Sequence, residues 1–149
     1  MDTYPNIWNF CYRGIKYGLL FGALLGALYG TVVFAVIIGT LYGFILGGGV
    51  GLLVGTAFGT VNWYVTRLVY PRLTHELYGV VLALCGGLFS GVCTFLAYSL
   101  LFHFRLNNLN PWYDVMRLAG FPAIIAAVAG IWTASRIASW YIKVVTQTA

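Results

Sequence analysis

Charged side chains are scarce in this sequence, and acidic ones are nearly absent. Of 149 residues, eight are Lys or Arg and only three are Asp or Glu, so that charged residues make up 7% of the chain. A soluble globular domain carries about 25% charged residues. Since 61% of the residues are hydrophobic, the composition excludes a soluble domain and predicts an all-α integral membrane protein.

Side chains able to carry chemistry are equally few. The three acids are Asp2, Glu76 and Asp114, and the two histidines are His75 and His103. None of the acids falls in an expected span, whereas proton pumps and ion-coupled transporters need an ionisable group at membrane depth. No nucleophile–base pair, phosphate loop or metal-ligand spacing is found. We therefore predict no enzyme, no metal site and no cofactor; a bound lipid, quinone or pigment would leave no pattern in the sequence.

Glycine, in contrast, is abundant and regularly spaced. It recurs at every fourth position in two stretches, and this spacing is close to one helical turn, so each set forms a flat stripe along one helix face. In water each such glycine costs about 1 kcal/mol relative to alanine, but in a bilayer small residues let two helices approach closely. The helix-packing residues predicted here are Gly14, Gly18, Gly22, Gly26, Gly30, Gly43, Gly47, Gly51, Gly55 and Gly59.

The glycine stripes lie in a stretch of fifty uncharged residues, 17–66. A single helix of that length would measure about 75 Å, more than twice the thickness of the hydrocarbon core. The chain must fold back, and Gly39 with Thr40 favours a turn near 38–42. We predict spans at 17–37 and 44–66, forming a glycine-zipper hairpin.

Two further spans are expected at 78–102 and 121–143. The whole chain, 1–149, then forms a single polytopic membrane domain with four transmembrane helices. Both later spans carry small-residue faces of their own. Their predicted packing residues are Gly87, Gly91, Ala126, Gly130 and Ala134.

The segments outside the spans are predicted to lie at the membrane surface. Residues 1–16 form an interfacial N-terminal segment with a short helix near 4–15. Residues 103–117 form a polar loop with a short interfacial helix near 111–118, since Asn-Pro is a favourable helix start. Pro122 is expected to separate that helix from the last span.

Basic residues predict the orientation of the spans. Six of the eight fall on the side that holds both termini, and two fall on the other. The positive-inside rule then places both termini on the cytoplasmic side of a bacterial cytoplasmic membrane or its equivalent in an organellar inner membrane. The basic residues are scattered singly, so no nucleic-acid partner is expected; the expected partners are lipids and other integral membrane subunits.

Three residues are candidates for contacts with a lipid or a partner: Arg136, Trp112 and Trp140. Arg136 lies four residues before Trp140, which places its Cα about 6 Å inside the aromatic belt. Either Arg136 extends to the interface, or it contacts a lipid phosphate or an acidic group of another subunit.

The glycine stripes, Arg72 followed by Glu76, and the sequence GGLFSG at 86–91 resemble the Tim17/Tim22/Tim23 family of mitochondrial translocase subunits. That family also includes an accessory subunit of respiratory complex I. The resemblance implies four short spans and a role in a protein translocase or a respiratory assembly.

Two functions from different classes follow. The first is a non-catalytic accessory subunit that stabilises a larger membrane complex, such as a respiratory or photosynthetic electron-transfer complex, by close glycine-mediated packing. The alternative is a small homo-oligomeric channel or translocase component in which the glycine stripes line a pore. The first predicts stable association with other subunits, and the second predicts self-assembly.

Overall fold

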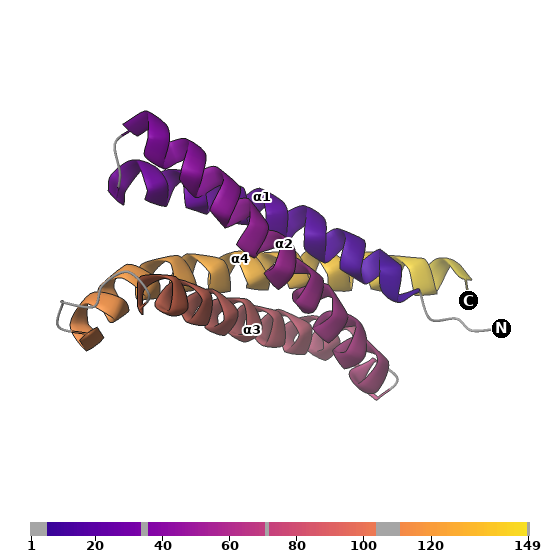
Figure 1. Cartoon of the computed structure of the whole chain (residues 1–149). Coiled ribbons are helices and arrows are strands. Elements are labelled where there is room, and N and C mark those ends of the chain that lie inside the picture. Colours follow the sequence, from indigo (N-terminus) through magenta and orange to yellow (C-terminus); the bar gives the residue numbers. More distant parts are fainter. Residues whose placement is uncertain (1–5, 34–35, 71, 104–110, 149) are drawn as a thin grey trace.

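The chain folds into four long helices and no other regular structure within the described residues (Figure 1). The structure is a computed structural model that describes residues 6–33, 36–70, 72–103 and 111–148. Of residues 32, 33, 36, 101–103, 111–118 and 148 only the backbone is described. The helices are α1 (Ile7–Val33), α2 (Val36–Val69), α3 (His75–His103) and α4 (Pro111–Thr148).

Three of these helices are long and apolar enough to cross a membrane. The qualifying stretches are Ile37–Val69 in α2, His75–Leu100 in α3 and Ala119–Gln147 in α4. Their outward faces carry large aliphatic side chains, as expected for helices whose solvent is lipid. The protein is therefore an all-helical, multi-pass membrane protein.

The helices are arranged as two antiparallel hairpins. In Figure 1, α1 lies along α2 and α3 lies along α4. The two hairpins meet near the end where α1 begins and α4 finishes, and they diverge toward the opposite end. This splayed arrangement leaves a space between the pairs that is described below.

An aromatic cluster joins the hairpins where they meet. Tyr70, just after α2, has its ring centroid 4.7 Å from that of Tyr141 in α4 and 5.1 Å from that of Tyr78 in α3. Phe10 of α1 completes the cluster, 6.0 Å from Tyr141. The Tyr78 hydroxyl is hydrogen-bonded to Thr66 at 2.9 Å, so this buried polar group is satisfied. This cluster therefore holds α1, α3, α4 and the end of α2 together at one end of the molecule.

The turn of the first hairpin differs from the prediction. It was expected at 38–42, but α1 ends at Val33 and α2 begins at Val36, so the predicted spans 17–37 and 44–66 are misplaced at the turn. Gly39 continues the glycine face of α2, and its backbone meets Gly30. Thr31 and Thr40, whose hydroxyl oxygens are 2.7 Å apart, form a hydrogen bond between the helices. Glycine and threonine here serve packing rather than chain reversal.

The two short interfacial helices are also corrected. The segment predicted at 4–15 is, from Ile7 onward, the first part of the continuous helix α1, because the buried Phe10 packs on α4 instead of lying on a membrane surface. Residues 104–110 of the predicted loop 103–117 lie outside the described residues. The helix predicted at 111–118 is the beginning of α4.

Pro122 does not end a helix as predicted. It lies inside α4 and is fully buried. Proline removes one backbone hydrogen bond, but a membrane helix tolerates this where neighbouring groups cover the gap. The last two predicted elements are therefore one helix.

Candidate functional site

The glycine faces of α1 and α2 lie directly against each other. A Cβ placed on Gly22 would come within 2.7 Å of the Cα of Gly51, and one on Gly26 within 2.8 Å of the Cα of Gly47. These distances are shorter than any real Cβ contact, so only hydrogen fits. The arrangement is reciprocal. A Cβ on Gly22 would collide with the carbonyl oxygen of Gly47, and a Cβ on Gly47 would collide with the carbonyl oxygen of Gly22. The Cα–H groups therefore point at carbonyl oxygens of the facing helix, the geometry of weak Cα–H···O contacts.

Every glycine predicted to pack in this hairpin lies in the α1–α2 interface. Gly14, Gly18, Gly22, Gly26 and Gly30 of α1 face Gly43, Gly47, Gly51 and Gly55 of α2, while Gly59 meets the backbone of Phe10 and Cys11. Glycines between these positions behave differently. A Cβ on Gly49 would meet nothing within 4 Å, and one on Gly48 would meet only Ala23 at 3.8 Å. Whether a glycine contacts the facing helix is therefore decided by the side of the helix on which it lies.

The α3–α4 interface is built on the remaining predicted small residues. A Cβ on Gly91 would lie 3.1 Å from the Cβ of Ala127, and one on Gly130 would lie 2.7 Å from the Gly86 carbonyl oxygen. Gly87 packs against Ile131. Ala134 is fully buried in the same interface.

Two contributors to this second interface were not among the predicted packing residues. A Cβ on Gly86 would lie 2.7 Å from the Cβ of Ala134, and Ser90 donates a hydrogen bond to the carbonyl oxygen of Ala126. The signal was the sequence GGLFSG, which places both residues beside Gly87 and Gly91. The pattern alone could not show that α4 contacts both Gly86 and Gly87.

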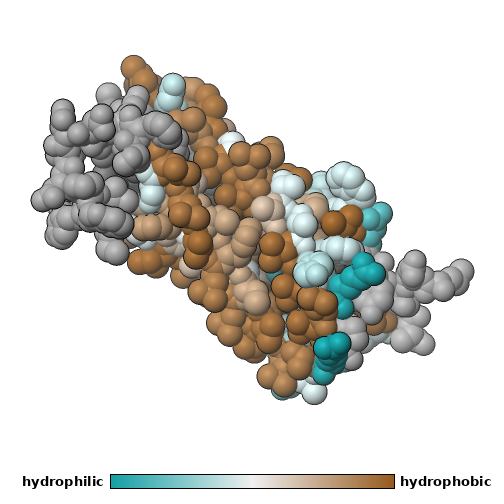
Figure 2. Space-filling model, turned by 60° about the horizontal axis from the view of Figure 1, so that its bottom comes forward, coloured by the Kyte–Doolittle hydropathy of each residue, from teal (hydrophilic) through white to brown (hydrophobic). Residues whose placement is uncertain are grey.

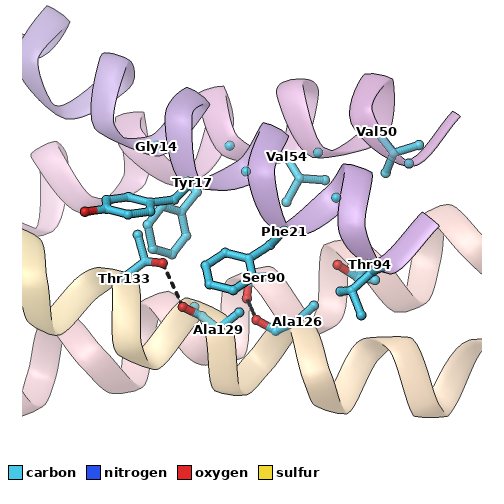
Figure 3. Close-up of a pocket in the computed structure, with 18 of the residues that line it drawn as sticks. Gly14, Tyr17, Phe21, Val50, Val54, Ser90, Thr94, Ala126, Ala129 and Thr133 are labelled. Atoms are coloured by element: carbon cyan, nitrogen blue, oxygen red, sulfur yellow. Dashed lines mark hydrogen bonds between the residues drawn. The ribbon is translucent and has the colours of Figure 1, made fainter. Parts of the chain in front are cut away.

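A crevice lies between the two hairpins, with about 640 Å³ of empty space, part of it open to the outside. Figure 3 shows Tyr17 and Phe21 projecting from α1 toward Ser90 and Thr133 on the opposite side. The flat glycine surface of the first hairpin forms the other part of the lining. Further lining residues are Gly14, Gly18, Gly22, Leu25, Gly47, Val50, Gly51, Val54, Gly55, Phe58, Thr94, Tyr98, Ala126, Ala129 and Gly130.

The crevice is suited to apolar contents. None of the described residues that line it carries a charge. Ser90 donates to the Ala126 carbonyl oxygen, and Thr133 donates to that of Ala129 at 2.8 Å, so both hydroxyls are engaged with the helix backbone. An occupant of this space would meet hydrocarbon, aromatic rings and glycine backbone.

Cations gather at the end where the hairpins meet, next to the end of the crevice that is lined by Gly14 and Tyr17. Figure 2 shows the hydrophilic residues of this view concentrated at one end of an otherwise hydrophobic surface. The guanidinium carbon of Arg13 lies 4.1 Å from the ring centroid of Trp140, and that of Arg136 lies 5.2 Å from the ring of Trp132. Such positions favour cation–π attraction.

The structure thus places Arg136 and Trp140, two of the three candidate contact residues, on the α1–α4 seam. The Trp112 side chain lies outside the described residues. Sequence reasoning missed Arg13 and Trp132 because their importance depends on pairing between helices more than a hundred residues apart.

Within the described residues, no three His, Cys, Asp or Glu side chains lie close enough together to hold a metal ion. All three cysteines are free thiols.

Comparison with known proteins returns no match: no family model, no curated protein and no solved structure resembles this chain closely enough to be matched. The fold and the crevice define its class by themselves, as a multi-pass helical membrane protein made of two small-residue hairpins that splay apart.

Proposed function

We propose that this protein is a non-catalytic structural subunit of a larger membrane complex. The observation that carries the proposal is that its small-residue faces are used within the chain, between α1 and α2 and between α3 and α4. What the chain presents outward is bulky and apolar: Ile37 is 78% exposed, Leu53 71% and Leu88 70%. Such ridges can fill grooves between the helices of larger subunits.

The proposal includes four membrane spans. Helix α1 has 27 residues and is about 40 Å long, more than the hydrocarbon thickness of about 30 Å. Its glycines from Gly14 to Gly30 lie against α2. Since α2 is long and apolar enough to span the membrane, α1 would lie at the same depth in the bilayer. Both termini then lie on the cytoplasmic side, or its organellar equivalent, by the positive-inside rule.

The proposed setting is a respiratory or photosynthetic electron-transfer complex in a bacterial cytoplasmic or organellar inner membrane. Partners would be other membrane subunits and lipids. The role is to stabilise assembly, because the chain offers a pre-packed apolar body and few groups for chemistry.

The alternative, a homo-oligomeric channel or translocase component, needs glycine faces that are free to line a pore. In this chain those faces oppose each other within one hairpin, with backbone atoms in contact. Several glycines of these faces also border the crevice between the hairpins. The geometry therefore favours the structural subunit.

The test is native gel electrophoresis of the source membrane in mild detergent, followed by mass spectrometry of the band that holds this chain. We expect the chain to migrate with larger membrane subunits in a fixed ratio, and its removal to lower the amount of the assembled complex. A discrete band containing this chain alone, with unchanged amounts of every other complex after its removal, would overturn the proposal.

A further inference from the structure

Two arginines lie at the same level on the seam between α1 and α4. These helices run antiparallel (Figure 1). Arg13 of α1 lies over Trp140, and Tyr17, one turn further along α1, packs edge-on against Trp132 with 5.6 Å between centroids. On α4, Arg136 falls midway between these two tryptophans, on the same side of the helix. It therefore lies level with the turn that links Arg13 to Tyr17.

Lys16 on that turn adds a third cation, and it is exposed like Arg136. Among the residues whose side chains are described, none of the three forms an ion pair, and the one acid, Glu76, belongs to the start of α3. Three like charges at the edge of an apolar body would be stabilised by an anion placed between them. The anion that a membrane surface supplies at this depth is a lipid phosphate.

The crevice begins directly beyond the cations. Tyr17 and Phe21 both line the crevice. Both also pack on Trp132, with 5.6 Å and 6.0 Å between the ring centroids. The lining of the crevice along α1 extends from Gly14 to Leu25, about 17 Å of helix. That length is close to half of the hydrocarbon core of about 30 Å, the part occupied by the acyl chains of one leaflet.

We propose that the crevice holds an acyl chain of an anionic phospholipid whose phosphate is bound by Arg13, Lys16 and Arg136. The apolar lining accounts for the acyl chain, and the cation group beside the Gly14 end of the crevice accounts for the headgroup. The site goes beyond the role proposed above, since it needs no partner subunit and is complete within one chain.

Native mass spectrometry of the purified full chain, released from mild detergent, tests this proposal. The probes are phosphatidylglycerol and phosphatidylcholine with the same acyl chains. We expect one phosphatidylglycerol to be retained at least about tenfold better than phosphatidylcholine, and we expect the double variant Arg13→Gln/Arg136→Gln to lose that preference. Arg67→Gln is the matched control, because Arg67 also lies near a tryptophan ring, 5.6 Å from Trp63, but on α2 away from the crevice.

A second variant, Ala129→Leu, tests the acyl chain separately by filling the crevice while leaving the cations in place. It should lower retention of both lipids, with circular dichroism and elution volume unchanged. Equal loss with Arg67→Gln would mean attraction to general surface charge and would overturn the site. Unchanged lipid retention in both the double variant and Ala129→Leu would also overturn it, as would complete displacement of the lipid by inorganic phosphate at low millimolar concentration.

Discussion

At the scale of single residues, the direction in which a glycine points decides what it contributes. Gly47 and Gly49 are two positions apart on α2, yet a Cβ on the first would lie 2.7 Å from the Cα of Gly26, whereas a Cβ on the second would meet nothing within 4 Å. The first glycine is required by close backbone approach. The second is a helix position where a larger side chain would fit.

This contrast gives a matched pair of variants. Gly47→Ala should destabilise the first hairpin by at least about 1–3 kcal/mol, the usual cost of overpacking, because rigid backbone faces the new methyl group. Gly49→Ala should be neutral or slightly stabilising, since alanine is the better helix former. Resistance to unfolding in a graded denaturing-detergent series, read by circular dichroism, measures both. Equal stability of the two variants would contradict the backbone contact described here.

The Ser90 hydroxyl is a second residue-scale case. Its bond to the Ala126 carbonyl oxygen connects α3 to α4 beside Gly130. Ser90→Ala should remove about 0.6 kcal/mol, typical of a hydrogen bond between membrane helices, without changing the fold. The same denaturation series checks this, with Ser135→Ala as the control, because the Ser135 hydroxyl donates to the carbonyl oxygen of Ile131 in its own helix. An equal loss in the control would show that the cross-helix bond adds nothing.

At the scale of elements, the two helices of each hairpin are held in one register by contacts along their whole length. In the first, glycine contacts fill the middle, and polar pairs lie toward the two ends: Thr31 with Thr40, and Cys11 with Thr60 at 3.6 Å between sulfur and oxygen. A slip of one residue would push side chains into the facing backbone. The alignment is therefore specific although glycine backbone forms the centre of the interface.

The alignment can be tested by a disulfide. Thr60→Cys places a second thiol beside Cys11, close enough for a bond after a small rotation, so oxidation should link α1 to α2 in high yield. Thr56→Cys lies one turn away and should not react with Cys11. Peptide mapping under non-reducing conditions detects the bond. Failure of Thr60→Cys to react while Thr56→Cys does would mean a different alignment.

At the scale of the whole molecule, the hairpins are joined by an aromatic cluster at one end and diverge toward the other, where Tyr29 of α1 still contacts Tyr98 of α3 with 5.7 Å between ring centroids. Phe10, Tyr70, Tyr78 and Tyr141 form the fastening, and the crevice follows from the divergence beyond it. The angle between the hairpins therefore depends on a small number of aromatic contacts. The bulky outer faces and the crevice both depend on that angle.

Phe10→Ala should loosen this fastening. Phe10 is fully buried, so its loss removes packing worth up to about 3–5 kcal/mol, and the hairpins should sample wider angles. Trp8→Ala is the control, since Trp8 is 71% exposed. Spin labels at the exposed positions Leu41 and Leu96, with native cysteines replaced by serine, report the distance between the free ends. An unchanged distance distribution in Phe10→Ala would contradict the role of the cluster.

Local pattern was sufficient for the helical membrane class and for the helix face on which each glycine of the predicted set lies. Hydropathy and four-residue spacing are properties of short stretches, and they do not depend on what the rest of the chain does. Gly39 with Thr40 predicts a chain reversal and Pro122 predicts a helix end, but the structure places all three residues inside helices. In both cases a residue that interrupts a helix in water is accepted within one here, because packing against the neighbouring helix surrounds it.

The crevice and the cation group were decided by the tertiary structure. Arg13 and Arg136 lie at the same height along the bundle because α1 packs antiparallel to α4. The crevice next to them exists because two separately packed hairpins diverge. Sequence by itself determined that this protein is a helical membrane protein and which helix faces are flat. Which faces meet, which glycines are left open and where an apolar space forms depend on contacts between distant segments, and no local pattern encodes those contacts.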